Sequence, residues 1–204
     1  ADLVLVEGDP SVAIDATLSI AHVIRNGVRV AGSANGADAS PASGRALDTA
    51  DIADFEAGTN GFSWVDTTDA MAGGNSEAAS SVRDGVLRTE FAVRAGFFVP
   101  WAGAGYFPAS PDAAALDLSQ SATLVLRLRA KAGDYRVMLF NPGLTGAPPT
   151  VDLTLDETWR TVRLDMRDVA GFDPAEFAGF AVVGGTQPGE AWIEIAEAGF
   201  EPPP

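Results

Sequence analysis

The sequence predicts an all-β protein, in which a jelly-roll β-sandwich over residues 51–201 follows a small three-stranded fragment over residues 1–31. Two observations lead to this fold class. From Asp51 onward, apolar and polar residues alternate with a period of two in one segment after another, and turn signals separate these segments. Helical periodicity is almost absent; one short helical turn is expected at Asp173-Pro174, where Asp can cap and proline fits the first helical position.

The first thirty residues predict three strands. Ala1 to Glu7 is a short apolar run that ends at a Gly-Asp-Pro turn signal. Ile20 to Arg25 and Val28 to Val30 flank Asn26-Gly27, which predicts a hairpin because a type I′ turn needs positive φ at both central residues. Three short strands are too few to close a core of their own.

Residues 32–50 predict a flexible linker that separates the two parts. This segment is rich in Gly, Ala, Ser, Asp and Pro and has almost no large apolar residue. Such a composition buries too little apolar surface to offset the entropy that ordering would cost. The domain boundary is therefore expected here.

The remaining residues predict roughly nine or ten strands of a two-sheet sandwich. Leucines alternate with polar or smaller residues from Leu124 to Arg129, and similar alternation runs from Tyr135 to Phe140 and from Thr161 to Met166. Asp84-Gly85 separates two further strand candidates and predicts a hairpin. The glycines of the Met71 to Ser76 segment lie between strands, so they are expected to serve strand geometry rather than to hold a phosphate.

Composition excludes several classes of function. A formal net charge of −15 disfavours nucleic acid and anionic membrane surfaces as partners. No apolar run approaches the roughly 18 residues of a membrane span. The absence of cysteine excludes disulfides and thiolate zinc sites, and a single histidine, His22, removes most histidine-based mechanisms.

The segments ADLVLVEGDP and IAHVIRNGVRV, with Ile14 between them, resemble the C-terminal end of the amidohydrolase superfamily, specifically imidazolonepropionase-like metal-dependent hydrolases. The resemblance implies that residues 1–31 complete a small β domain packed beside a catalytic (β/α)8 barrel. It also implies Zn²⁺ or another divalent metal in the parent enzyme, not bound by this chain. No His-x-His motif is present, so this chain alone is expected to be non-catalytic.

Certain residues, many of them aromatic, acidic or glycine, follow one another in a particular order through residues 51–201. They are Asp54-Phe55, Trp64, Met71, Gly73 to Ser76, Gly85 to Phe91, Gly96-Phe97, Tyr135, Trp159, Phe180 and Trp192 to Ile195. In this order they resemble the complex I intermediate-associated protein 30 family, a galactose-binding-like jelly roll. The resemblance implies a non-catalytic module that assists assembly or binds a partner. It does not name a ligand.

The first candidate site is an aromatic loop over residues 97–107. Phe98, Trp101 and Tyr106, together with Trp64 from an earlier strand, are the expected ligand contacts, because Trp and Tyr rings can stack on the faces of pyranose sugars. The alternative is that these rings cap the end of the sandwich or pack on the barrel of the parent enzyme.

The second candidate is a carboxylate cluster of Asp54 and Glu56 from the first strand of the sandwich and Glu197 from the last, with Glu194 as a substitute. Neighbouring first and last strands would bring these oxygens together to hold a structural Ca²⁺. Acidic residues are common throughout this chain, so a solvated surface is the alternative.

The third candidate is a set of arginines, Arg127, Arg129, Arg136, Arg160 and Arg163, whose alternation places most of them opposite the leucines. They could form a local patch for anions or acidic sugars. A salt-bridged outer face is the favoured interpretation.

Three functions fit these observations. The favoured one is a non-catalytic C-terminal accessory domain of a metal-dependent amidohydrolase, which serves docking, assembly or ligand binding and has the catalytic barrel or another copy of the chain as partner. The alternatives are an independent, lectin-like carbohydrate-binding module with a glycan as partner, and a polypeptide that completes a nicked amidohydrolase. Analogy between folds favours the bacterial periplasm or the extracellular space.

Overall fold

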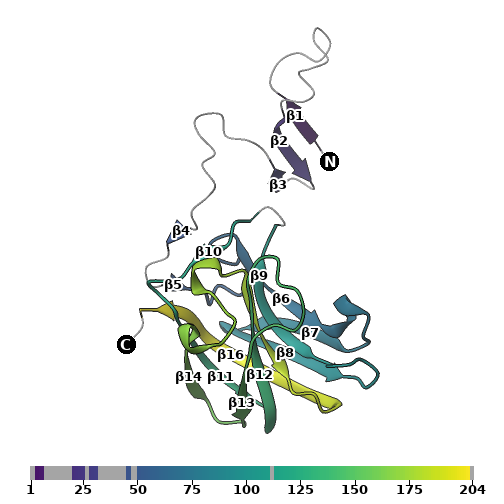
Figure 1. Ribbon diagram of the computed structural model, residues 1–204. Coiled ribbons are helices and arrows are strands. Elements are labelled where there is room, and N and C mark those ends of the chain that lie inside the picture. Colours follow the sequence, from purple (N-terminus) through teal and green to yellow (C-terminus); the bar gives the residue numbers. More distant parts are fainter. Residues whose placement is uncertain are drawn as a thin grey trace. The chain divides into compact units, whose positions relative to one another are not determined.

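The structure is a computed structural model that divides into two units, Ala1–Pro41 and Ala42–Pro204 (Figure 1). It describes strands at residues 3–6, 20–25, 28–31 and 45–46, and the continuous stretches 50–110 and 113–202.

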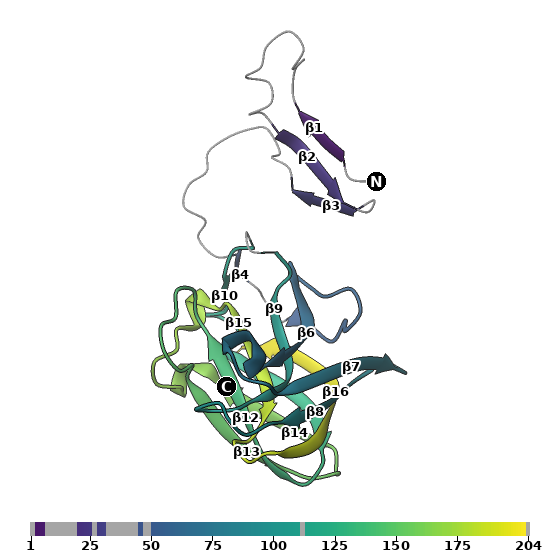
Figure 2. The same ribbon diagram turned by 90° about the vertical axis from the view of Figure 1, so that its right-hand side faces the viewer.

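The first unit contains a three-stranded antiparallel sheet, as predicted (Figure 2). Its strands are β1 (Leu3–Val6), β2 (Ile20–Arg25) and β3 (Val28–Ala31), in the order β1-β2-β3. Arg25 pairs with Val28 across the two-residue connection, which is the register that the Asn-Gly hairpin predicts.

The segment for which a linker is predicted contains two short strands. β4 (Arg45–Ala46) pairs in parallel with β10 (Leu116–Asp117), and β5 (Ala50–Asp51) pairs with the last strand of the sandwich. These strands belong to the second unit. The rest of the predicted linker, residues 32–44 and 47–49, lies outside the described residues, so its flexibility stays a prediction.

The second unit is a two-sheet antiparallel sandwich, which confirms the predicted jelly-roll class. One sheet has the order β14-β11-β16-β8-β7, with β5 added on β16, and the other has the order β13-β12-β15-β9-β6. The bounds are β6 (Phe62–Thr68), β7 (Glu77–Arg83), β8 (Val86–Val93), β9 (Ala102–Pro108), β11 (Thr123–Ala130), β12 (Gly133–Phe140), β13 (Thr150–Leu155), β14 (Arg160–Asp165), β15 (Gly179–Gly184) and β16 (Gly189–Glu201).

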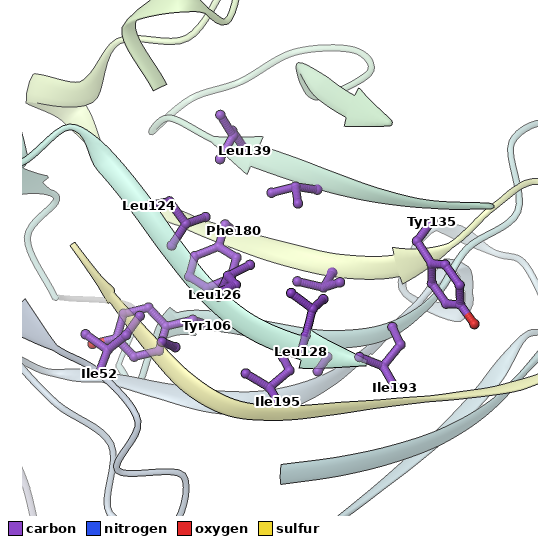
Figure 3. Close-up of a cluster of buried hydrophobic side chains, with 14 of the residues drawn as sticks. Ile52, Tyr106, Leu124, Leu126, Leu128, Tyr135, Leu139, Phe180, Ile193 and Ile195 are labelled. Atoms are coloured by element: carbon purple, nitrogen blue, oxygen red, sulfur yellow. The ribbon is translucent and has the colours of Figure 1, made fainter. Parts of the chain in front are cut away.

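The inner faces of the two sheets form one hydrophobic core (Figure 3). Leu124, Leu126 and Leu128 of β11 are buried, and Tyr135 and Leu139 of β12 are buried with them. These side chains belong to the segments whose alternation predicted one buried face. Burial of apolar surface at about 25 cal/mol per Å² is the main force that holds the two sheets together.

Two connections have the local conformation that their turn and capping residues predict. Asp84 and Gly85 join β7 to β8 and have φ angles of 53° and 73°, both positive as a type I′ turn requires. Pro174–Glu176 is a single 3₁₀ turn, and the Asp173 carboxylate accepts a hydrogen bond of 3.0 Å from the Ala175 backbone N–H. In the part of the chain that the structure describes, no helix is long and apolar enough to cross a membrane.

The aromatic loop expected over residues 97–107 is in part a strand. β9 begins at Ala102 and lies between β6 and β15, and its first five residues are buried. Gly and Ala have low strand propensity, which is why the sequence pattern suggested a loop. Small residues are required at two positions of this central strand, because a Cβ on Gly103 would lie 2.1 Å from the Val182 carbonyl oxygen and one on Gly105 would lie 2.3 Å from the Phe107 ring.

Candidate functional site

The four aromatic residues predicted as ligand contacts fall into two groups. Trp64 of β6 and Tyr106 of β9 lie opposite each other in register, and both rings point into the core. Tyr106 is 0% exposed, its hydroxyl donates to the Thr59 carbonyl oxygen at 2.6 Å, and burial raises its pKa. The Trp64 Nε1–H donates to the Ile52 carbonyl oxygen at 2.8 Å. Both rings stabilise the sandwich: Tyr106 is fully buried, and Trp64 is half-buried against the core.

Phe98 and Trp101 lie on the surface instead. Phe98 is 96% exposed, and the neighbouring Phe97 ring contacts the half-buried Trp101 ring edge-on, with centroids 5.7 Å apart. Met71, which is 79% exposed, accepts a weak 3.9 Å hydrogen bond at its sulfur from the Thr67 hydroxyl in the adjoining strand. Large contiguous apolar patches mark interaction surfaces, whereas single exposed apolar residues are common on proteins.

Trp101 packs onto the outward face of the five-stranded sheet. We call this surface the aromatic face and define it by Trp101, Phe107, Arg136, Met138, Phe140, Asp152, Ala181 and Val183. Phe107 and Phe140 contact each other with ring centroids 5.1 Å apart. Met138, Ala181 and Val183 are buried under these rings although they lie on the outside of the sandwich. The aromatic face is therefore apolar at its centre.

Arg136 is the charged residue at the edge of this apolar centre. It lies between Val183 on β15 and Asp152 on β13, and one of its terminal nitrogens donates to the Pro100 carbonyl oxygen at 3.2 Å. Its Nε is buried and has no hydrogen-bond partner among the residues that the structure describes. Burial lowers the pKa of Arg136, and the negative charge of Asp152 opposes this shift. A buried donor of this kind is costly unless a ligand or water accepts its proton.

A buried carboxylate, Asp69, holds Trp101 in place. Its oxygens accept hydrogen bonds from the Ser76 backbone N–H and hydroxyl, both at 2.8 Å, and from the Trp101 backbone N–H at 3.3 Å. The Asp69 backbone N–H in turn donates to the Trp101 carbonyl oxygen at 3.0 Å. This cluster ties the segment before β9 to the 3₁₀ helix Asp69–Ala72 that follows β6.

The glycines after Met71 serve this cluster, which corrects the expectation that they serve strand geometry. A Cβ on Gly74 would lie 2.3 Å from the Asp69 Cγ, so only glycine leaves room for the buried carboxylate. Gly73 ends the 3₁₀ helix with a φ of 94°. The sequence signal was present, because an acidic residue stands at the end of a strand just before Met-Ala-Gly-Gly-Asn-Ser, but nothing local indicated that Asp69 is buried.

The structure does not bring the predicted calcium ligands together. Asp54 accepts a hydrogen bond from the Ala57 backbone N–H at 2.9 Å, Glu56 is exposed, and Glu197 forms an ion pair with Arg127 at 3.2 Å. Among residues 51–110 and 113–202, no three acidic or histidine side chains form a group that could hold a metal ion. Each of these carboxylates is accounted for by local contacts or by solvent.

Four of the five predicted arginines form ion pairs, and three of them, Arg127, Arg129 and Arg163, lie on the outward face of the six-stranded sheet. Arg127 pairs with Glu197, Arg129 with Glu194, Arg160 with Asp156 and Arg163 with Glu201. This is the salt-bridged face favoured from the sequence. Arg136 belongs to the other sheet, as described above.

The comparison with solved structures supports the fold. No family model matches the chain, and no curated protein matches it. Among solved structures, the family 11 carbohydrate-binding module of a cellulosomal cellulase of Clostridium thermocellum is similar, with a TM-score of 0.57, 13% identity and coverage of 77% of this chain and 96% of that chain. The same family in complex with a β-1,3-1,4-mixed-linked tetrasaccharide has a TM-score of 0.55, 13% identity and coverage of 76% and 96%. A family 29 carbohydrate-binding module follows at 0.50, with 12% identity and coverage of 76% and 92%.

At these identities the similarity establishes the fold alone. The second unit has the jelly-roll β-sandwich that carbohydrate-binding modules use. The resemblances to the complex I intermediate-associated protein 30 family and to amidohydrolases stay predictions, because no family model supports either of them.

Proposed function

We propose that residues 42–204 form a carbohydrate-binding module that holds a glycan on the aromatic face. The observation that carries this proposal is the Arg136 side chain, whose buried Nε–H finds no acceptor within the described part of the protein and whose terminal nitrogen donates to the carbonyl oxygen of Pro100, the residue before Trp101. The shared fold of carbohydrate-binding modules supports the same ligand class. On this proposal the module meets its glycan in the bacterial periplasm or outside the cell.

The chemistry of the aromatic face suits a sugar. A pyranose has an apolar C–H face and a rim of hydroxyls, so it needs a ring to stack on and polar groups beside that ring. Trp101 supplies the ring, and the Asp69 cluster fixes the backbone that carries it. Arg136 offers a donor, and the exposed Asp152 opposite it in register offers an acceptor. Phe98, three residues before Trp101, exposes a further ring.

Isothermal titration calorimetry with a panel of soluble neutral and acidic glycans tests the proposal. We expect Trp101→Ala and Arg136→Gln each to weaken the binding of the glycan that wild type binds by at least tenfold, which is about 1.4 kcal/mol. Leu144→Ala is a matched control, because it removes an exposed apolar side chain from the β12–β13 loop and should leave the affinity unchanged. Thermal melts should show that all three variants are folded. Wild-type affinity in a folded Trp101→Ala variant would contradict the proposed site.

A second function is favoured by the first unit. The three strands of the sheet β1-β2-β3 match the number that the resemblance to the end of an amidohydrolase β domain implies for residues 1–31. We therefore also propose that the glycan-binding module is an accessory domain carried by a metal-dependent hydrolase, whose barrel is its partner. Sequencing the DNA upstream of the codon for Ala1 tests this. An open reading frame for a barrel with His-x-His is expected, and an unrelated domain there would overturn the assignment.

A further inference from the structure

The outward face of the six-stranded sheet carries a second arrangement of aromatic and charged side chains. We call it the tryptophan–arginine face and define it by Arg88 (β8), Arg129 (β11), Trp159 (before β14), Trp192 and Glu194 (β16). The Arg88 guanidinium lies 4.7 Å from the centroid of the Trp192 ring. The Arg129 guanidinium lies 4.9 Å from the Trp159 centroid and 6.0 Å from the Trp192 centroid. It therefore bridges the two indoles, which are both half-buried.

Strand register fixes these positions. Arg88, Glu194 and Arg129 lie directly opposite one another on the adjacent strands β8, β16 and β11, which are neighbours in Figure 1. The two oxygens of Glu194 accept hydrogen bonds from Arg88 at 2.8 Å and from Arg129 at 2.6 Å. Burial raises the pKa of Glu194, but the hydrogen bonds from the two arginines outweigh burial and hold the pKa below its ordinary value. The row is thus a rigid cation–anion–cation unit beside two indole rings.

Two hollows lie on this face. One has a volume of about 690 Å³ and is lined in part by Arg88, Arg129, Trp159 and Glu194. The other has a volume of about 640 Å³ and is lined in part by Trp192. Ala79 and Glu90 line both hollows, so the two are adjacent to each other on β7 and β8. Each falls in the range of about 300–1,000 Å³ that is typical of ligand sites.

The hollows follow the strand direction. The first includes Arg83 at one end of β7, and the second includes Glu77 at the other end. At about 3.4 Å per residue, β7 spans roughly 20 Å between these positions. A ligand that fills both hollows is therefore extended, with several linked units rather than one.

We propose that the tryptophan–arginine face is a second carbohydrate site, which takes an extended, neutral oligosaccharide. Indole rings supply stacking surface, and carboxylate and guanidinium groups that are already paired supply acceptors and donors to hydroxyls. A neutral ligand is favoured over an anionic one because two carboxylates, those of Glu194 and Glu90, already balance the charges of Arg88 and Arg129, so an anion would meet no net positive charge in this group. The proposal takes its ligand class from the proposed function but rests on different residues, in the other sheet.

On this proposal the module has one glycan site on each of its two sheets. The aromatic face belongs to β9, β12, β13 and β15, and the tryptophan–arginine face belongs to β8, β11, β16 and the segment before β14. The two layers of the sandwich separate them. One molecule can therefore hold two glycan chains at once and link them, with a gain in apparent affinity for a polymer that presents many copies of the ligand.

The indole N–H signals of the four tryptophans in a ¹H–¹⁵N spectrum test this proposal, because each site contains its own tryptophans. The probes are oligosaccharides of mixed-linkage β-glucan of increasing length and, as the anionic counterpart, oligogalacturonates. We expect the signals of Trp159 and Trp192 to shift with the neutral series, with affinity that rises with chain length until the face is filled. Shifts confined to Trp101, or stronger binding of the oligogalacturonates, would overturn the proposal.

Calorimetry on variants separates the two sites. In a Trp101→Ala background we expect one site to remain, and the further change Trp192→Ala to weaken it at least tenfold. Arg163→Ala is the matched control, because it removes a paired arginine from the same sheet outside both hollows. If Trp101→Ala alone abolishes all binding, the second site is wrong and the first stands. If Trp192→Ala alone abolishes it, the aromatic face is wrong and the second site stands.

Polymer crosslinking gives an independent readout. Wild-type protein mixed with soluble mixed-linkage β-glucan should form light-scattering complexes near equivalence, and either Trp101→Ala or Trp192→Ala should prevent them because each removes one of the two sites. Scattering by wild type that persists unchanged in Trp192→Ala would contradict a linking role for the tryptophan–arginine face.

Discussion

Asp69 is fully buried, yet it fixes the position of Trp101 on the aromatic face. Its carboxylate satisfies three N–H or O–H donors, and its backbone N–H closes the cluster on Trp101. Hydrogen bonds to a charged acceptor contribute about 1.5–3 kcal/mol each, and losing such an acceptor leaves buried donors unsatisfied. The position of Trp101 on the aromatic face therefore depends on a residue that no ligand touches.

Replacement of the Asp69 carboxylate by an amide tests how much this hydrogen-bonded cluster contributes to stability. Asp69→Asn places an N–H₂ group where one oxygen accepts from Ser76, so we expect a loss of about 1–3 kcal/mol in the free energy of unfolding. Urea denaturation measures it. Asp168→Asn is the control, since Asp168 is exposed and its change should cost less than about 0.5 kcal/mol. Equal stability of Asp69→Asn and wild type would show that the cluster does not contribute to the free energy of unfolding.

Residue type alone did not separate ligand contacts from core residues. Trp64, Phe98, Trp101 and Tyr106 are all aromatic and were all predicted to face a ligand. Trp64 and Tyr106 point inward because β6 and β9 are paired so that both residues fall on the core side. Trp101 comes just before β9 and packs on the outside of the sheet. Register decided the difference, and register depends on contacts between strands that are distant in the sequence.

At the scale of single elements, hairpins were the most predictable part of the fold. The connections at Asn26-Gly27 and Asp84-Gly85 both join antiparallel strands in the expected register. A two-residue turn can be recognised locally because its geometry requires positive φ angles. β9 was missed for the converse reason: its residues have low strand propensity, and it forms because neighbours on both edges and both faces enclose it.

The Asp84-Gly85 turn gives a test at this scale. Gly85 has a φ of 73°, and a Cβ there would meet no other atom, so Gly85→Ala isolates the cost of backbone strain. We expect a loss of about 1–2 kcal/mol in the free energy of unfolding. Gly189→Ala is the control, because its Cβ would also meet open space and its φ lies outside the left-handed region. A Gly85→Ala variant as stable as the control would contradict the assignment of a strained left-handed position.

At the scale of the whole molecule, the core of the sandwich is contained in the second unit. Its buried hydrophobic residues run from Ile52 to Phe200. Removal of residues 1–41 should therefore leave one cooperative unfolding transition, with a midpoint within about 2 °C of the full chain. Differential scanning calorimetry measures it.

A second truncation that begins at Ala53 serves as the comparison. It also removes Ile52, which is fully buried, and the strand β5 that pairs with β16. Loss of a buried aliphatic side chain costs about 2–5 kcal/mol, so the midpoint should fall by several degrees. A large loss of stability on removal of residues 1–41 alone would mean that the two units depend on each other.

The sequence by itself determined the all-β class, the hairpins, the buried alternation of β11 and β12, and the narrow range of chemistry open to a chain with one histidine and no cysteine. These properties are local, because a period of two and a turn dipeptide can be recognised from a few adjacent residues. The tertiary structure alone decided which aromatic rings face outward, that Arg136 retains a buried donor, and that Glu194 lies between two arginines. Those properties arise from the pairing of strands that are as far apart in the sequence as Arg88 and Glu194, which are separated by 106 residues, and the alternation within one strand does not specify its partner.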